Sequence, residues 1–514
     1  MLALAVILVV GAVVRLVHIG QPGLWMDEIG SIQMASGRGL AHDHLPIGII
    51  EHHQVDLTPL AGAPSWWKIW TAQSDNVNPP LYYILLRWWM DALGTGAGAA
   101  RLLSAIFSLA AVAVFFDVCR LLHGARIALL AAALMSLANA QLDFAQDARA
   151  YAMLIFLGLC SCDAVVRIEQ RGATPRRLAM LAIALSAAAL THYFALGAAL
   201  ALGAYVLIRL RGVQRRRTLA AFAAAGGFCL LVWAPQYFQQ VHSLPSLAPA
   251  FLQEALASRH AELTLRRIIG LPAEFIFGES RGEAILPKAA LILAVLSFVL
   301  PAIQLWRRRD LLLWVLWIAG IIGSIAVLDL VRGLTLVGYP RYTILASPAV
   351  YAVVAAFDWP RRPILRDTLV LATLVLLMLV TAQRMRDGVV NREDWRALGD
   401  LIQTQAGRDE LLVFFNQDPW VPPGVFYRGF RYYAADSNRP WMMLNRPADL
   451  PVLRQLDSVR TLWLIGKFAG SSGPIVLPGW QNVATTQTDA WTACHMRLVV
   501  PSARLVSSTR RTPP

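Results

Sequence analysis

Long apolar runs recur from residue 2 to residue 383, and they constrain this chain more than any other feature of its sequence. A helix that crosses a bilayer needs about 20 predominantly apolar residues. Runs near that length lie at residues 2–18, 101–120, 126–141, 150–167, 178–191, 195–209, 218–235, 287–306, 311–329, 342–358 and 367–384. Only 15% of the residues are charged, whereas soluble domains have about 25%. The pattern therefore predicts an α-helical polytopic membrane protein with about 11 spans.

The net charge of +14 is concentrated in five short breaks between these runs. The breaks are residues 120–126, 167–177, 209–217, 307–310 and 358–367, and together they hold 17 Arg and 4 acidic residues. Arg in alternate short loops is the signal that keeps those loops in the cytoplasm. A nucleic-acid-binding protein would instead gather basic residues on one soluble face. We therefore expect no nucleic-acid partner, and alternation of the spans places the N-terminus inside and the region after residue 384 outside.

The apolar segment at residues 80–93 is too short for a span, and Arg87 interrupts it. Counting it as a span would also move every later Arg-rich break to the outside. We predict a helix that lies along the outer interface, with Asn78 as its N-cap and Pro79-Pro80 in its first turn. Nearby tryptophans suit the lipid headgroup layer; they are Trp66, Trp67, Trp70, Trp88 and Trp89.

Two domains are expected from the change of composition near residue 384. Residues 1–384 would form the membrane domain, with a first outer loop at about 19–100. Residues 385–514 alternate charges, turn residues and short apolar runs, which predicts a small extracytoplasmic α/β domain. Within it we predict a helix at 394–403 and strands at 411–415, 461–465 and 496–500.

The predicted topology places several ionisable and aromatic residues on the outer side. They are Asp27, Glu28, Asp147, Arg149, Tyr151, His192, Arg341 and Tyr342. Ionisable groups near the hydrocarbon are energetically costly, so they usually mark a functional site or are paired. A carboxylate there can act as a general base, and Arg can bind a phosphate and stabilise it as it leaves. A His can add a phosphate contact or bind a divalent ion together with a carboxylate.

Each of these groups also has a structural interpretation. Asp27 and Glu28 could cap a helix in the outer loop. Asp147 and Arg149 could form an ion pair. A single His in a turn is more often a hydrogen-bonded or interfacial residue, and an Arg-Tyr pair often anchors a helix end. The fact that these residues share one predicted side and occur in this order supports a functional site more strongly than any single residue does.

The order of motifs along the chain resembles the GT-C superfamily of integral-membrane glycosyltransferases. The similar branch is that of protein O-mannosyltransferases and aminoarabinose lipid A transferases. The resemblance covers roughly the first 400 residues. Its motifs are Leu24-Trp25-Met26-Asp27-Glu28, Asn78-Pro79-Pro80-Leu81-Tyr82-Tyr83, Arg101-Leu102-Leu103-Ser104, Ala145-Gln146-Asp147-Ala148-Arg149-Ala150-Tyr151, Thr191-His192-Tyr193-Phe194, Arg341-Tyr342 and Asp394-Trp395-Arg396.

This resemblance implies a transferase that uses a polyprenyl-phosphate-linked sugar, inverts the anomeric centre and works on the outer face of the bacterial inner membrane. It implies that Asp27 is the catalytic residue of the first outer loop and that Asp147 is a second acidic residue near the substrates. The residues expected to bind substrate are Glu28, Asn78, Arg149, Tyr151, His192, Arg341 and Tyr342. Some relatives use a divalent metal, for which Asp27 and His192 are the candidates here.

The acceptor stays open between a lipid, a glycan and a protein. Aminoarabinose transferases carry Lys before the Pro-Pro pair, where this chain has Asn78. Two other functions share some of these features: a transporter or flippase for lipid-linked sugars, and a ligase or polymerase of lipid-linked glycans. A transporter would more often place charges at mid-membrane and show internal repeats.

Overall fold

The structure is a computed structural model, and it divides the chain into two compact units. It describes residues 2–72, 78–243, 260–278, 287–332, 336–357, 363–387, 393–416, 422–445, 449–450, 452–453, 459–467, 480–488 and 491–498. The helical unit comprises Met1–Pro22, Gly30–Leu40 and Thr58–Val390. The sheet unit comprises Gly23–Ile29, Ala41–Leu57 and Asn391–Pro514, so it includes two short segments of the first outer loop.

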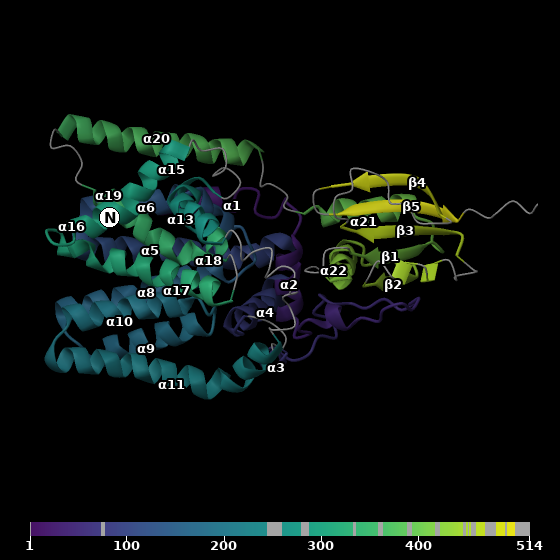
Figure 1. The fold of residues 1–514 in the computed structure, drawn as a ribbon, viewed down its shortest axis with the longest axis horizontal. Helices are drawn as coiled ribbons and strands as arrows, with labels where there is room; N and C mark the ends of the chain where they lie inside the picture. The colour runs from purple at the N-terminus through teal and green to yellow at the C-terminus, as the bar shows by residue number, and fades with distance from the viewer. Residues whose placement is uncertain are drawn as a thin grey trace, which may run out of the picture. The chain divides into compact units, whose positions relative to one another are not determined.

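The first half of the chain is mostly helical (Figure 1), with its longest non-helical stretch between α2 and α3. Its α-helices are α1 (Leu2–Leu16), α2 (Met26–Ala35), α3 (Lys68–Thr71), α4 (Leu81–Leu93), α5 (Ala97–His123), α6 (Ala125–Leu137), α7 (Asn139–Ala145), α8 (Tyr151–Arg171), α9 (Pro175–Ala189), α10 (Ala195–Arg209) and α11 (Gly212–Ser243). A short 3₁₀ helix, η1, covers Ala41–His44. The division between the units falls inside α2.

The second half of the helical unit contains more broken helices. They are α13 (His260–Phe277), α15 (Pro287–Ala294), the π-helical turn η3 (Val295–Val299), α16 (Leu300–Gln304), η4 (Arg309–Leu311), α17 (Leu312–Arg332), η5 (Leu336–Gly338), α18 (Pro340–Thr343), η6 (Ile344–Ala346), α19 (Ser347–Ala355) and α20 (Pro363–Asp387). Every predicted apolar run therefore contains helix, although described residues near some run ends, such as 17–18, 190–191, 305–306 and 356–357, are not helical. Among those residues, 4 helices are long and apolar enough to cross a membrane, or 5 if the bent pair α6–α7 is one span.

Four details differ from the sequence-based prediction. The run at 126–141 is bent by 58° between α6 and α7, and the run at 342–358 is split by η6. The helix α13 lies between the predicted spans at 218–235 and 287–306, where no helix was predicted. Asn78 is not the N-cap of α4: that position is taken by Pro80, whose side chain makes no capping bond. Proline fixes the backbone angle at the helix start and has no N–H to satisfy, so α4 begins without a polar cap.

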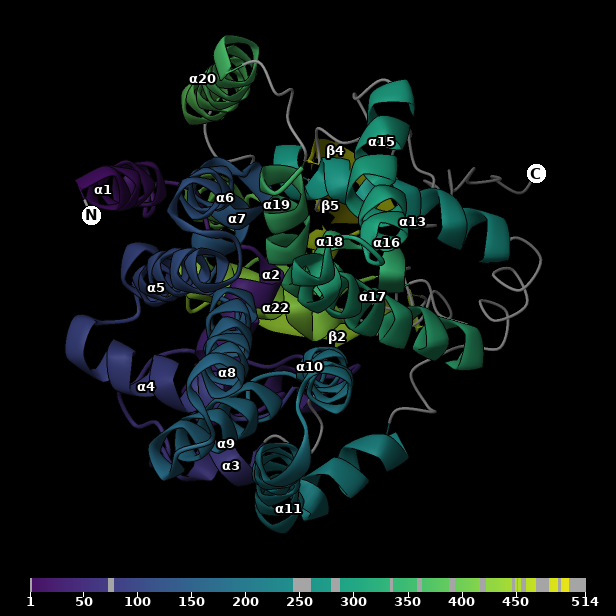
Figure 2. The same cartoon turned by 90° about the vertical axis from the view of Figure 1, so that its left-hand side faces the viewer.

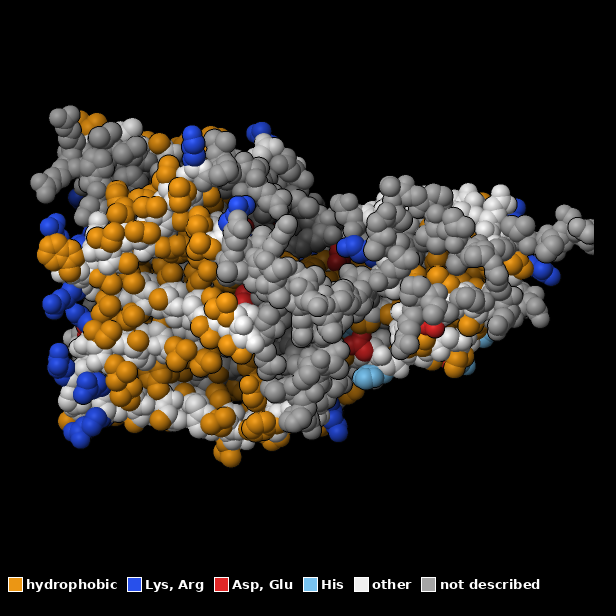
Figure 3. All heavy atoms as spheres, viewed as in Figure 1, with side chains coloured by type: hydrophobic (Ala, Val, Ile, Leu, Met, Phe, Trp, Pro, Cys, Tyr) orange, Lys and Arg blue, Asp and Glu red, His pale blue; other side chains and the backbone are white. Residues whose placement is uncertain are grey.

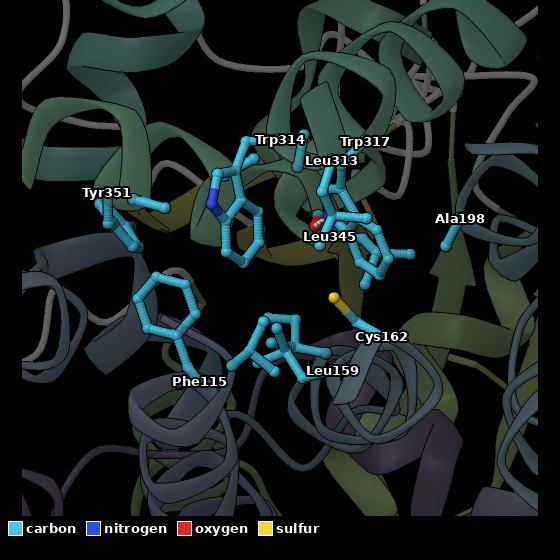
Figure 4. Packing of buried hydrophobic residues seen from close by; sticks show 14 of the residues in the cluster. Phe115, Leu159, Cys162, Ala198, Leu313, Trp314, Trp317, Leu345 and Tyr351 are labelled. Carbon is cyan, nitrogen blue, oxygen red and sulfur yellow. Dashed lines mark hydrogen bonds between the residues drawn. The ribbon is translucent and has the colours of Figure 1, made fainter. Parts of the chain in front are cut away.

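The core of the helical unit is formed by α5, α6, α8, α10, α17 and α19, which pack side by side (Figure 2). Figure 4 shows Phe115 of α5 and Trp314 of α17 turned toward each other, with ring centroids 5.7 Å apart. The buried indole N–H of Trp317 donates to the Leu345 carbonyl, which satisfies a polar group inside the core. Between α10 and α17 the packing is closest at Gly197 and Gly320, where small residues let the backbones approach.

The Arg-rich breaks meet at one end of the helical unit. Arg167 is paired with Asp117, Arg209 with Glu169 at 2.7 Å, and His123 with Asp310 at 2.9 Å. Arg308 also donates to the Ala356 carbonyl, which joins the fourth break to the helix before the fifth. Figure 3 shows basic side chains along its left-hand edge and a largely hydrophobic flank beside them. This distribution is the one that the positive-inside pattern predicts.

The sheet unit is built on a five-stranded sheet with the order β2-β1-β3-β5-β4. Its strands are β1 (Leu411–Phe415), β2 (Trp441–Leu444), β3 (Thr461–Gly466), β4 (Trp480–Gln487) and β5 (Thr492–Leu498). β1 pairs in parallel with β2 and β3, while β5 pairs antiparallel with β3 and β4. Two helices accompany it, α21 (Trp395–Gln405) and α22 (Pro423–Tyr433). The predicted helix and the strands at 411–415 and 461–465 are present. The strand predicted at 496–500 overlaps the end of β5, which begins at Thr492, and residues 499–500 lie outside the described residues. The helix α22 and the strands β2 and β4 were not predicted.

Candidate active site

A chain of ring contacts in the helical unit joins five of the residues singled out from the sequence. The guanidinium of Arg149 lies 5.9 Å from the Tyr151 ring, and that ring is 5.9 Å from His192. The His192 ring stacks on Phe194 at 4.6 Å, and Phe194 meets Tyr342 at 5.4 Å.

The far end of this chain is Arg341, whose guanidinium lies 4.9 Å from the Tyr342 ring. Residues from the turn before α8, the turn before α10 and the helix α18 are thus brought together. We call this set, Arg149, Tyr151, His192, Phe194, Tyr342 and Arg341, the cationic–aromatic cluster. Two cations held on aromatic faces suit an anionic ligand whose neighbouring groups are apolar.

Arg149 is held from both its backbone and its side chain. Its N–H donates to the Asp147 carbonyl at 2.7 Å, and its own carbonyl accepts from the Ser104 hydroxyl at 3.2 Å. Its guanidinium reaches the Ser31 hydroxyl at 3.4 Å. The Asp147 side chain is buried beside this turn. Asp147 and Arg149 therefore lie in one tight turn. Because they are two residues apart in it, their side chains can have different roles.

Tyr82 of α4 lies next to the same turn. Its hydroxyl is 3.4 Å from the Ser104 hydroxyl, which in turn bonds the Arg149 backbone. Burial raises the pKa of Tyr82, the Ser104 hydrogen bond opposes that rise, and the charge of Asp147 adds to it. The start of α4 is joined to the α9–α10 turn by the Leu81 N–H, which donates to the Leu190 carbonyl at 3.0 Å. Asn78, just before α4, is buried.

His192 is a neutral imidazole in this environment. Burial, together with the charge of Arg149, lowers its pKa to about 3. Its Nδ1 accepts the Phe194 N–H at 3.2 Å, which places the single ring proton on Nε2. His192 can therefore donate a hydrogen bond through Nε2, whereas metal binding through that atom would require the other tautomer.

Arg267 of α13 is a candidate that the sequence analysis missed. Its guanidinium lies 5.6 Å from the Tyr339 ring, and Arg341 lies 5.5 Å from the same ring. The turn that carries Tyr339 is fixed by Asp329, whose carboxylate accepts the N–H groups of Leu336 and Val337 at 2.9 and 2.8 Å. Two guanidinium groups around one tyrosine form a more basic site than the Arg341-Tyr342 motif alone indicated.

Asp27 and Glu28 belong to the sheet unit and begin α2. Glu28 is 1% exposed, and its carboxylate accepts the Trp25 N–H at 3.2 Å, which closes the first turn of the helix. This contact favours a structural role for Glu28. Asp27 is half-buried, and its position in the first turn of α2 places it where a helix N-terminus favours a negative charge.

No protein-family model and no curated protein sequence matches this chain. Solved structures do match it. ArnT from Cupriavidus metallidurans in the apo state is 13% identical with a TM-score of 0.53, over 96% of this chain and 97% of that one. The same protein bound to undecaprenyl phosphate is 14% identical with a TM-score of 0.53 over the same shares. The chain has the GT-C fold.

A further match is the oligosaccharyltransferase AglB from Archaeoglobus fulgidus, in complex with an inhibitory peptide and a dolichol-phosphate. It is 12% identical with a TM-score of 0.49, over 90% of this chain and 69% of that one. The match to ArnT confirms the expected fold class, a GT-C-type helical protein with a small C-terminal α/β unit.

Within this GT-C fold, the helical unit gathers Arg149, Tyr151, His192, Arg341 and Tyr342, while Asp27 and Glu28 lie in the sheet unit. Among the described residues, no group of three or more His, Cys, Asp or Glu side chains could hold a metal ion. The two metal candidates, Asp27 and His192, also belong to different units. A role for Arg267 could not be predicted from the sequence, because the residues around it form no recognisable motif.

Proposed function

We propose that this protein transfers a sugar from a polyprenyl-phosphate-linked donor to a lipid, glycan or protein acceptor on the extracytoplasmic face of the bacterial inner membrane. The observation that carries the proposal is the cationic–aromatic cluster, together with Arg267. Three arginines and a neutral histidine there suit a phosphate with sugar and isoprenoid neighbours. The GT-C fold supports it, because one structure of that fold holds undecaprenyl phosphate.

The orientation rests on the Arg-rich end of the helical unit. Four contacts join those breaks, or residues next to them, at one end of the unit. Short basic loops of membrane proteins stay in the cytoplasm. The turn that carries Arg149 follows the bent pair α6–α7, and the turn that carries His192 follows α9. Both α6 and α9 begin in Arg-rich breaks. We therefore assign the cationic–aromatic cluster to the outer side.

In the proposed reaction, Asp27 takes the proton from the acceptor hydroxyl. The acceptor oxygen attacks C1 of the donor sugar from the face opposite the phosphate. A new C1–O bond to the acceptor forms as the C1–O bond to the phosphate breaks, and the anomeric centre inverts. Polyprenyl phosphate leaves with the bonding electrons, and the charge that develops on it is stabilised by arginine. Asp147 is assigned to positioning the substrates beside Arg149.

Binding of undecaprenyl phosphate to the purified protein tests the donor site. Arg341→Ala and Arg267→Ala each remove a charge-assisted contact and should weaken binding by about 10- to 100-fold. Arg211→Ala, which removes an exposed Arg in the break between α10 and α11, is the matched control and should bind as the wild type does. Equal affinities for all three well-folded variants would exclude Arg267 and Arg341 from phosphate recognition.

A further inference from the structure

The backbone just before Asp27 is held by three side chains of the sheet unit. The Leu24 N–H donates to the Tyr433 hydroxyl at 2.6 Å. The Met26 N–H donates to the Glu393 carboxylate at 2.6 Å. The Met26 carbonyl accepts from the Arg428 guanidinium at 2.7 Å. Residues about 400 positions apart in the chain thus fix both backbone groups of Met26, the residue next to Asp27.

These side chains are themselves held in place. The same Glu393 oxygen accepts the Trp395 indole N–H at 2.7 Å. Arg428 is buried and lies 3.3 Å from the ring nitrogens of His42, another residue of the sheet unit. Burial, with the charges of Arg428 and His44, lowers the pKa of His42 to about 2, so its ring is neutral and does not repel the guanidinium. Glu393 and Arg428 are therefore each held by a further contact within the sheet unit.

The helix that carries Arg428 and Tyr433, α22, packs closely against its neighbours. A Cβ on Gly429 of α22 would lie 2.5 Å from the Trp395 ring of α21. A Cβ on Gly424 would meet the His42 carbonyl of η1 with no room between them. Glycine at these two positions lets α22 lie directly against α21 and η1. Because Arg428 and Tyr433 lie on α22, a displacement of this helix would disturb their contacts with Met26 and Leu24.

Electrostatics connects the anchors with Asp27 itself. Burial raises the pKa of Glu393, its two N–H donors oppose that rise, and the charge of Asp27 adds to it. The Glu393 carboxylate therefore lies within electrostatic reach of the Asp27 carboxylate. A general base works only when it is held within hydrogen-bonding distance of the proton that it takes.

We infer that Glu393, Arg428 and Tyr433 are positioning residues that hold the Asp27 carboxylate in its reactive place, so that the C-terminal unit is part of the catalytic machinery. The inference rests on the proposed function, in which Asp27 is the base. A misplacement of about 1 Å can cost a hundredfold in rate. The competing interpretation is that these contacts only stabilise the fold.

Two glutamates of the sheet unit offer a matched test. Glu393 and Glu410 each accept an indole N–H, from Trp395 and Trp463 respectively, but only Glu393 also holds Met26. Glu393→Ala should lower kcat for sugar transfer by about 10- to 100-fold and leave KM for the donor unchanged. Glu393→Gln keeps an oxygen that can accept both N–H groups, so it should recover most of kcat. Glu410→Ala should leave kcat unchanged.

Hydrogen exchange provides a second readout that does not depend on activity. The amides of Leu24 and Met26 should exchange faster in Glu393→Ala and Tyr433→Phe than in the wild type, and Glu410→Ala should not change them. Equal loss of kcat in Glu410→Ala, or normal kcat and normal exchange in Tyr433→Phe and Glu393→Ala, would overturn the inference. Asp27→Asn is measured in parallel: full activity in that variant would instead refute Asp27 as the base.

Discussion

At the scale of single residues, the two neighbouring acids at the start of α2 should behave differently. Asp27→Asn keeps the size of the side chain but removes the base, which is typically worth about 10² to 10⁴ in rate. Glu28→Gln keeps an oxygen that can accept the Trp25 N–H, so its turnover should stay near that of the wild type. The measurement is turnover of the purified proteins with a polyprenyl-phosphate sugar. A larger loss in Glu28→Gln than in Asp27→Asn would reverse the assignment.

His192 provides a test based on pH. Its pKa of about 3 lies far below the usual 6.5, so the imidazole stays neutral when the pH is varied between about 5 and 8. His192→Phe keeps an aromatic ring but removes the N–H donor, so it should weaken donor binding by about tenfold, as expected for one lost hydrogen bond, and leave the pH dependence of turnover unchanged. An ionisation that disappears from the pH profile in this variant would show that His192 titrates during the reaction.

At the scale of helices, the close packing of α10 against α17 can be tested with two glycines of α10. A Cβ on Gly197 would lie 2.8 Å from the Ile321 backbone and 2.9 Å from the Gly320 carbonyl, and neither can move aside. Gly197→Ala should lower stability by about 1–3 kcal/mol. Gly203 has open space around its Cβ position, so Gly203→Ala should be neutral or slightly stabilising. Thermal unfolding in detergent compares them, and equal melting temperatures would contradict the packing argument.

The orientation of the helices can be measured by labelling cysteines from outside the cell. Arg211→Cys, in the break between α10 and α11, should react only after the cells are permeabilised. Asp436→Cys, exposed in the sheet unit, should react in intact cells. The opposite result would place the sheet unit in the cytoplasm and Asp27 on the wrong side of the membrane.

Helix positions could be predicted from the sequence because apolar runs of spanning length have few other stable structures. The bend between α6 and α7 and the split near η6 could not, because composition does not show where a helix breaks. The strand β4 was not predicted because it lies at the edge of the sheet, where most of its residues are polar and face solvent. The helix α13 was not predicted because its charged residues, among them Glu262, Arg266 and Arg267, are typical of a loop between spans.

At the scale of the whole molecule, the sequence indicated which turns share a side but not which side chains meet. The ring contacts that link Tyr151, His192 and Tyr342 join three distant segments, and no local pattern predicts such contacts. The same holds for Glu393 and Arg428, whose contacts with Met26 depend on how the sheet unit folds. Motif order predicted the fold, while the supporting contacts required the structure.

The central claim is that this protein transfers a sugar from a polyprenyl-phosphate donor with Asp27 as the base. The most direct test compares, by mass spectrometry, the envelope lipids, glycans and glycoproteins of cells with the wild-type gene, with Asp27→Asn and without the gene. We predict that one sugar modification is present only with the wild-type gene and that its polyprenyl-phosphate donor accumulates in the other two strains. Identical modifications in all three strains, or full modification with Asp27→Asn, would contradict the account.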